Sequence, residues 1–162
     1  MSAMEPIDIK GLPAEFDGWQ ALLDLILGSF SYMDGLIDPP SSAHRLTLDA
    51  LQAKAKQEIL LLACSGDRLV GCLFIADRGD HSYLGKLAIA PSMQGRGLGR
   101  RFVGAAEDLA RAAGKSALEL QTRIELLDNH AAFARMGFAE TGRTAHPGFD
   151  RPTTITMRKV VA

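Results

Sequence analysis

A strand-turn-helix segment in the middle of the chain limits most strongly the folds that are open to it. It runs from Leu87 to Arg100 as LAIAPSMQGRGLGR, so an apolar strand stops at Pro91 and a helix follows a turn that contains Gly95, Gly97 and Gly99. Glycines permit positive φ angles and let a ligand approach the main chain. The amide groups of such a turn and the dipole of the next helix favour anions, and Arg96 and Arg100 add charge-assisted contacts to phosphate. The segment therefore predicts a phosphate-binding turn.

Two other phosphate motifs fail on spacing. The dinucleotide fingerprint GxGxxG requires a glycine at position 100 after Gly95 and Gly97, but Arg100 stands there. A P-loop requires Gly-Lys followed by Ser or Thr, and no such tripeptide follows these glycines. An ordinary strand-to-helix turn needs one flexible residue, whereas three alternating glycines flanked by arginines indicate a ligand.

Hydrophobic periodicity and turn residues predict the elements around this segment. Strands are expected at residues 7–10, 58–65, 69–76, 83–90, 117–122, 138–143 and 154–160. Helices are expected at residues 14–30, from a cap at Thr47 to residue 57, at 99–113, and from a cap at Asp128 or Asn129 to Gly137. This order predicts an α/β (α+β) fold with a mixed sheet covered on both faces, in one domain over residues 1–162. A doubly wound parallel sheet is excluded because helices do not separate every pair of strands.

The composition excludes several classes of partner. Lys and Arg number 18 and Asp and Glu number 19, so the net charge of −1 gives no general attraction to nucleic acid or to an anionic membrane. We expect a cytoplasmic protein, because the sequence has no signal pattern and no apolar stretch of membrane-spanning length. Two apolar runs pair through a turn at residues 66–67, where Cys64 would face Leu69 and Cys72 would face Leu61. This pairing predicts two buried thiols and no disulfide.

Two motifs carry a resemblance to a known family. Gln94, Gly97 and Gly99 match the pattern Gln/Arg-x-x-Gly-x-Gly/Ala, and residues 129–138 read NHAAFARMGF, a helix with an asparagine followed by Gly-Phe at the start of a strand. The first motif resembles the pyrophosphate-binding motif of the GNAT (Gcn5-related N-acetyltransferase) superfamily, and the order of elements is similar over residues 5–160. The resemblance implies a GNAT-like, mostly antiparallel, six- to seven-stranded sheet, with acetyl-CoA as cosubstrate and no metal.

The resemblance also implies a role for individual residues at the cosubstrate site. The pantetheine arm would pair like an additional strand with the backbone of Leu87, Ala88 and Ile89. The turn that begins at Gln94 would hold the pyrophosphate through the amides of Gly95, Arg96, Gly97, Leu98, Gly99 and Arg100. Asn129 would reach the pantetheine or the thioester, although a helix cap is its alternative role. The strand at 117–122 would diverge from the strand at 83–90 and open a slot.

For catalysis, the resemblance implies direct attack of a neutral amine on the thioester, with a general acid that protonates the leaving thiolate. Many relatives use a tyrosine four residues before the Gly-Phe pair, but Phe133 takes that place beside the expected cosubstrate and cannot donate a proton. Tyr83 is the substitute that we favour, because alternation along a strand would give it the same face as Leu87 and Ile89. The other candidates are His81, His130 and His146. Carboxylates that could attract a cationic amine, or else serve in turns, are Asp34, Asp38 and Asp150.

The sequence thus predicts an acyltransferase, an N-acetyltransferase that moves an acetyl group from acetyl-CoA to a primary amine in a ternary complex. The acceptor is expected to be a small-molecule amine or a peptide amine, in a site shaped by residues 31–45 and 144–152. A non-catalytic CoA- or acyl-CoA-binding module is the alternative that Phe133 leaves open, and a purely structural domain is another. A homodimer stays open as well.

Overall fold

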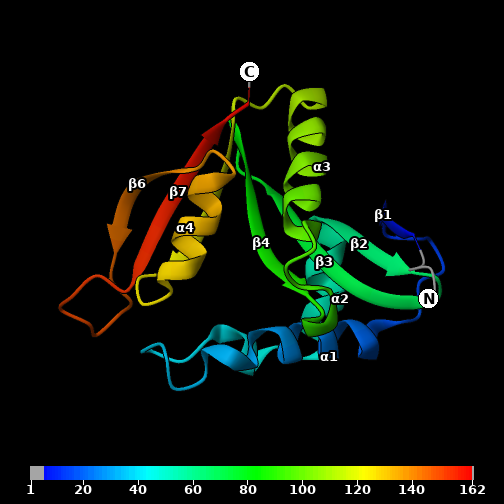
Figure 1. Ribbon diagram of the computed structural model, residues 1–162, viewed down its shortest axis with the longest axis horizontal. Coiled ribbons are helices and arrows are strands. Elements are labelled where there is room, and N and C mark those ends of the chain that lie inside the picture. Colours follow the sequence, from blue (N-terminus) through cyan, green and yellow to red (C-terminus); the bar gives the residue numbers. More distant parts are fainter. Residues whose placement is uncertain (1–5, 162) are drawn as a thin grey trace.

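The strands of the chain form one sheet. The computed structural model describes residues 6–161, whose seven strands lie in the order β1-β2-β3-β4-β5-β7-β6 (Figure 1). All neighbouring strands are antiparallel except β4 and β5, which are parallel. The predicted mixed, mostly antiparallel sheet is therefore confirmed. The strands are β1 (Ile7–Gly11), β2 (Ile59–Ser65), β3 (Arg68–Asp77), β4 (His81–Ile89), β5 (Ala117–Arg123), β6 (Ala139–Thr144) and β7 (Thr154–Val160).

Helices cover both faces of this sheet, as the sequence predicts. On one face, α1 (Trp19–Phe30) and α2 (Leu48–Gln57) bury Leu22, Ile26 and Leu51 against the strands. On the other face, α3 (Leu98–Ala112) buries Phe102, Val103 and Ala106, and Phe133 of α4 (Leu127–Arg135) packs at the margin of the same cluster. Three short 3-10 segments join these elements: η1 (Ser31–Met33), η2 (Ser42–Arg45) and η3 (Pro91–Met93).

The hairpin of β2 and β3 forms the centre of the core. Most of its residues are buried on both faces, and Gly66 in its two-residue turn has a φ of 60°. Cys64 pairs with Leu69, as predicted, but Cys72 pairs with Leu62 and not with Leu61. The reason is an irregularity of register next to Cys64, which shifts the rest of the hairpin by one residue. Both cysteines are free thiols; Cys72 is buried, as predicted, but Cys64 is only partly buried.

Helix starts were predicted with mixed success. The Thr47 side chain caps α2 by accepting a hydrogen bond from the Ala50 N–H at 3.1 Å, as expected. The first helix begins at Trp19 and not at residue 14, since a turn closed by a hydrogen bond from Phe16 N–H to the Pro13 carbonyl precedes it. The predicted cap of α4 at residues 128–129 is wrong: Leu126 is the N-cap, and no side chain caps this helix.

Candidate active site

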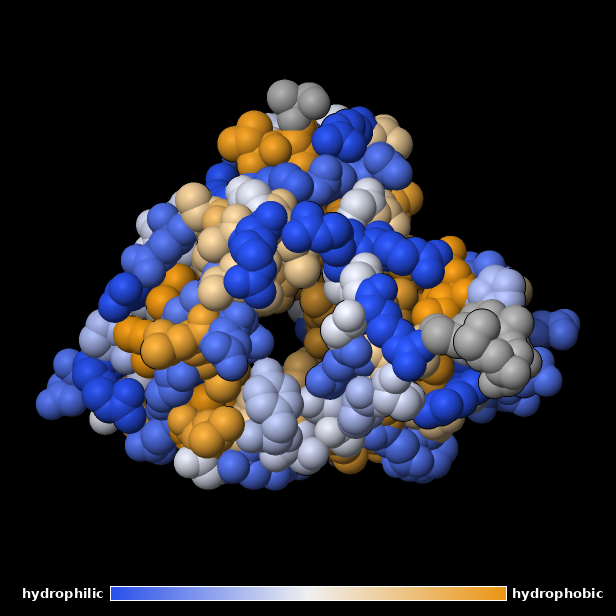
Figure 2. All heavy atoms as spheres, in the orientation of Figure 1, coloured by the Kyte–Doolittle hydropathy of each residue, from blue (hydrophilic) through white to orange (hydrophobic). Residues whose placement is uncertain are grey.

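The candidate site is a cavity of about 870 Å³ that lies where the two central strands of the sheet separate. β4 and β5 pair only from His81 opposite Ala117 to Leu84 opposite Leu120. Beyond these pairs, the end of β4 from Gly85 and the end of β5 at residues 121–123 line the cavity. Figure 2 shows the molecule hollowed near the middle of the face that it draws. The predicted slot between diverging strands is confirmed.

A β-bulge in β4 shapes one wall of this cavity. Between the pairs Cys72–Ala88 and Phe74–Gly85, two residues of β4 lie opposite one residue of β3. The first of the two, Lys86, has a φ of 51°, in the left-handed region that side chains other than glycine rarely adopt. The extra residue reverses the alternation of side chains along β4.

This bulge overturns the expectation that Tyr83 shares a face with Leu87 and Ile89. The latter two pack against the core under α3, and so does Leu84, which lies before the bulge. Because Tyr83 is the neighbour of Leu84, its side chain lies on the opposite face, that of α1 and α2. Tyr83 nevertheless lines the cavity, with its ring centroid 4.5 Å from the Arg78 guanidinium. Burial raises the pKa of Tyr83 although Arg78 lowers it, so the phenol keeps its proton at neutral pH.

The glycine turn leaves the N-terminus of α3 open. Gly95 and Gly97 have φ angles of 76° and 78°, and a Cβ atom at either position would meet no described atom within 4 Å. Gly97 is the N-cap of α3, and its carbonyl accepts a hydrogen bond from the N–H of Arg101 at 3.1 Å. The N–H groups of residues 98–100 therefore have no acceptor within the helix. Unhindered main-chain donors at the positive end of a helix dipole are suited to a diphosphate.

Gly99 has another role than the one expected. Its φ is not positive, and a Cβ atom there would lie 3.5 Å from Ile89 Cδ1 and 3.8 Å from Met136 Cε, which are ordinary contact distances. Neither the backbone conformation nor the space around position 99 therefore requires a glycine within the described structure. Leu98 is buried and fixes the first turn of α3 on the core. Gln94 donates from Nε2 to the Ile89 carbonyl at 3.3 Å, which ties the turn to the end of β4.

Of the twelve predicted cosubstrate residues, some line this cavity and others follow it in the glycine turn. Five line it: Leu87, Ile89, Gln94, Asn129 and Phe133. The turn residues from Gly95 to Arg100 follow Gln94 directly, and the side chains of Arg96 and Arg100 are exposed. Ala88 differs, since its side chain is fully buried in the cluster under α1 and α2 and only its main chain can serve a ligand. Ser29 Oγ accepts a hydrogen bond from the Ile89 N–H at 3.3 Å, so this donor already has a partner.

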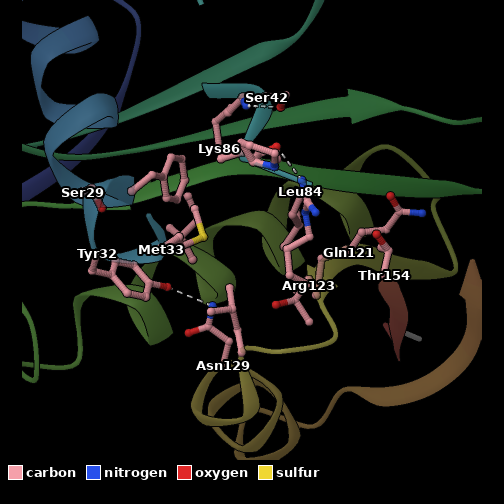
Figure 3. Close-up of a pocket in the computed structure, with 18 of the residues that line it drawn as sticks. Ser29, Tyr32, Met33, Ser42, Leu84, Lys86, Gln121, Arg123, Asn129 and Thr154 are labelled. Carbon is pink, nitrogen blue, oxygen red and sulfur yellow. Dashed lines mark hydrogen bonds between the residues drawn. The ribbon is translucent and has the colours of Figure 1, made fainter. Parts of the chain in front are cut away.

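α4 brings an amide and an aromatic ring to the cavity. Asn129 Nδ2 donates to Tyr32 Oη at 3.1 Å, and Figure 3 shows the two side chains meeting across the cavity between α4 and η1. Phe133, one helical turn later, packs edge-on against Phe138 with ring centroids 5.8 Å apart. Tyr32 was missed in the sequence because no short-range pattern links residues 32 and 129. Both tyrosines of the chain therefore line the cavity.

Cationic side chains at the cavity were missed as well. The Lys86 ammonium donates to Ser42 Oγ at 3.2 Å, and Arg123 Nη2 donates to the Pro40 carbonyl at 3.0 Å. Burial lowers the pKa of both residues; for Lys86, Lys54 adds to the decrease. Neither Lys86 nor Arg123 belongs to a recognisable sequence motif. The feature that distinguishes Lys86 is its positive φ angle, which exists only in the folded chain.

The histidines named as alternative acids divide into two groups. His146 lines the cavity and hydrogen-bonds through Nδ1 to Thr153 Oγ1, and burial, followed by the charge of Arg123, lowers its pKa. His81 lies outside the cavity lining and contacts Asp80, and His130 lies outside it with Nε2 donating to the Arg123 carbonyl at 2.8 Å.

None of the three predicted acceptor-side carboxylates is among the described residues that line the cavity. Asp34 pairs with His44 at 2.6 Å, and Asp38 pairs with Arg151 at 3.3 Å. Asp150 lies in the exposed arm before β7. These contacts agree better with a structural role in turns and loop packing than with capture of a cationic amine.

Comparison with known proteins assigns a class to this fold and site. Residues 19–138 match the model of the acetyltransferase (GNAT) family. An IAA acetyltransferase of Azospirillum brasilense is 34% identical over 142 residues, which is 86% of this chain and 90% of that protein. An aminoglycoside N(6')-acetyltransferase type 1 of Stenotrophomonas maltophilia is 29% identical over 156 residues, which is 90% of this chain and 94% of that protein.

Solved structures show the same architecture. The PaiA N-acetyltransferase from Thermoplasma acidophilum in complex with coenzyme A superposes with a TM-score of 0.77 at 15% identity, covering 96% of this chain and 99% of that one. The chain therefore belongs to the GNAT acetyltransferase family and is a GNAT-type acetyltransferase. The family expected from the glycine turn is confirmed, and membership favours an enzyme over a non-catalytic CoA-binding module.

Two kinds of feature are absent from residues 6–161. No described helix is both long and apolar enough to cross a membrane. Within the same residues, no three His, Cys, Asp or Glu side chains are grouped as ligands of a metal ion would be.

Proposed function

We propose that this enzyme transfers the acetyl group of acetyl-CoA to the primary amine of a small-molecule or peptide acceptor by direct transfer in a ternary complex. The observation that carries the proposal is the open glycine turn at the end of the cavity, where neither Gly95 nor Gly97 has an atom within 4 Å of a Cβ position. The solved relative with coenzyme A bound supports the same cosubstrate. We also propose a cytoplasmic location, and a homodimer is an arrangement to test.

The cosubstrate would lie along the unpaired end of β4. Its diphosphate would be held by the amides of Gly95–Arg100, and its pantetheine arm would pair with the main chain of residues 87–89. Asn129 would contact the arm or the thioester, because its amide lies on the cavity wall opposite β4. When bound, acetyl-CoA supplies an activated acyl group whose thioester carbonyl is open to a nucleophile.

The residues of the chain would orient this reaction and move its protons. The neutral amine forms a C–N bond to the thioester carbonyl carbon, its nitrogen gives up a proton to solvent, the C–S bond breaks, and the sulfur accepts a proton. Phe133 cannot give that proton, and we propose Tyr83 as the donor, since its raised pKa keeps the phenol protonated. Tyr32 is the alternative donor because it contacts Asn129 and also faces the cavity.

An amine panel tests the proposal directly. Purified protein is mixed with acetyl-CoA and single amines, and release of free coenzyme A is followed with a thiol reagent. We expect amine-dependent release, together with a higher melting temperature in acetyl-CoA, because a ligand that binds only the native state stabilises it. Absence of both effects at millimolar acetyl-CoA would remove the proposed function.

A further inference from the structure

The charge of the cavity wall has one sign. Among the described residues that line the cavity there is no aspartate or glutamate. The titratable bases that line it are His44, Arg45, Lys54, Lys86, Arg123 and His146. A polycationic amine would therefore find no carboxylate on this wall and several like charges.

Some of these bases already form an ion pair with a carboxylate that does not line the cavity. Lys54 pairs with Glu58 at 2.8 Å, and His44 pairs with Asp34 at 2.6 Å. Lys86 and Arg123 differ, since neither makes an ion pair within 4 Å among residues 6–161. The two differ in their surroundings: Glu125 and Asp38 offset part of the Arg123 charge, whereas Lys86 has Lys54 and Arg45 as its charged neighbours. A partly buried charge of this kind is costly, so a ligand anion would gain more at Lys86 than at an exposed lysine.

Lys86 and Arg123 converge on one short segment, although they come from different strands. Lys86 reaches Ser42 at 3.2 Å and Arg123 reaches Pro40 at 3.0 Å, so the two cations hold a segment of three residues from opposite sides of the split sheet. Figure 3 shows both side chains at the cavity, with Lys86 beside Ser42. We call Lys86, Arg123 and residues 40–42 the acceptor end of the cavity.

Two features of the acceptor end indicate a ligand. Lys86 is held in the left-handed region by the bulge, and backbone strain of this kind in a non-glycine residue is frequent at binding sites. Arg123 places a guanidinium fork on the same cavity wall, and its buried Nη1, like the buried Glu125 Oε1, has no hydrogen-bond partner. An arginine fork next to a lysine is the usual partner set for a carboxylate.

We propose that the acceptor is an amine that also carries a carboxylate, which binds between Lys86 and Arg123 while the amine points to the thioester. This inference rests on the proposed acetyl transfer and names its substrate class. It separates this chain from a polyamine or aminoglycoside acetyltransferase, whose acceptors are polycations.

The test compares matched acceptors. Amino acids and ω-amino acids are assayed against their own amides, and kcat/KM is measured for each pair. The amide of an α-amino acid has the more acidic ammonium and thus more neutral amine at pH 7, so preference for the acid cannot come from amine reactivity. We expect the acids to be favoured by roughly tenfold or more, as the loss of a charge-assisted contact implies. Acetylation with equal rates, or with amides favoured, would overturn the inference and leave the proposed function standing.

Variants assign the effect to the acceptor end. Lys86→Met should lower the acid-to-amide ratio of kcat/KM by roughly tenfold, and Lys86→Arg should restore part of it. Lys56→Met is the matched control, because Lys56 is an exposed residue of α2 outside the cavity lining. A loss of coenzyme A affinity in Lys86→Met with an unchanged ratio would assign Lys86 to the cosubstrate and contradict the proposal.

A binding measurement tests the inference without turnover. In the presence of coenzyme A, N-acetylated amino acids should raise the melting temperature, and the corresponding N-acetylated amides should raise it less. Equal shifts, or no shift with either product, would overturn the carboxylate site whatever the rate of acetyl transfer.

Discussion

The two ends of the cavity are built in different ways. At the cosubstrate end, consecutive residues of one turn present main-chain donors, and the exposed glycines keep side chains away. At the acceptor end, Lys86 and Arg123 come from two strands and meet a loop segment some 45 to 80 residues earlier in the chain. A binding site made by local conformation can be read from a motif, whereas a site assembled by the tertiary fold cannot.

The difference also has a functional side. In the proposed function, main-chain donors would recognise the diphosphate that every acetyl-CoA molecule carries, so this end could stay the same while acceptors change. Side chains decide the acceptor, and each can be replaced without changing the conformation of the turn. If the two ends are as independent as their construction indicates, a substitution at one end will leave the properties of the other end unchanged.

The largest effect is expected from the proton donor. Tyr83→Phe should lower kcat by roughly a hundred- to ten-thousandfold, because a general acid contributes about that factor, and should change the alkaline limb of the pH–rate profile. Affinity for coenzyme A should fall much less, since Tyr83 lies on the other side of the bulge from Leu87 and Ile89. Steady-state rates and calorimetric titration measure the two quantities. Tyr32→Phe is the parallel variant. If Tyr32→Phe greatly lowers kcat while Tyr83→Phe keeps the wild-type kcat, Tyr32 and not Tyr83 is the proton donor.

A second prediction addresses the turn. Gly97→Val should weaken coenzyme A binding by about a hundredfold, because a β-branched residue resists a φ of 78° and its side chain would occupy the space in front of the amides. Calorimetric titration of the variant checks this value.

The matched control for the turn is at the opposite end of α3. Gly114→Val meets the same backbone constraint, with a φ of 73° and no described atom within 4 Å of a Cβ. It should lower the melting temperature while coenzyme A affinity stays at the wild-type value. Equal losses of affinity in both variants would show that strain in α3, and not blocked amides, explains the result.

The smallest effect on acetyl transfer concerns the support under the acceptor end. Cys72 donates from Sγ to the Lys86 carbonyl at 3.4 Å, and burial raises the pKa of Cys72 to about 12 from an ordinary value of 9.0. The unfolded chain therefore loses this proton at a lower pH than the folded chain does. The stabilisation is complete below about pH 9 and is lost between about pH 9 and 12, at up to about 1.4 kcal/mol per pH unit.

Denaturant unfolding at several alkaline pH values measures that slope. Cys72→Ala should reduce it, and because the variant also removes a contact to the bulge, its acid-to-amide ratio should shift slightly. Cys64→Ala, at the less buried thiol, is the control. An unchanged alkaline slope in Cys72→Ala would mean that this thiol ionises in the same way in both states.

The sequence was sufficient for the order of elements, the family and the open glycine turn. These depend on local patterns: apolar periodicity, the Thr47 cap, and glycines around Gln94. The face of Tyr83 was predicted wrongly because alternation assumes a regular strand, and the bulge at Lys86 is fixed by pairing with β3. The contacts of Tyr32 and Arg123 could not be predicted for a related reason, because their partners are distant in the sequence.

The short parallel pairing between β4 and β5 has a mechanical consequence. Four residue pairs join the two halves of the sheet, β1–β4 on one side and β5, β7 and β6 on the other, and α3 packs on both halves. The two halves are thus joined at one end of the boundary between β4 and β5 and separated at the other end. A ligand bound in the open part would connect the two halves, so occupancy of the cavity would be coupled to the rigidity of the whole sheet.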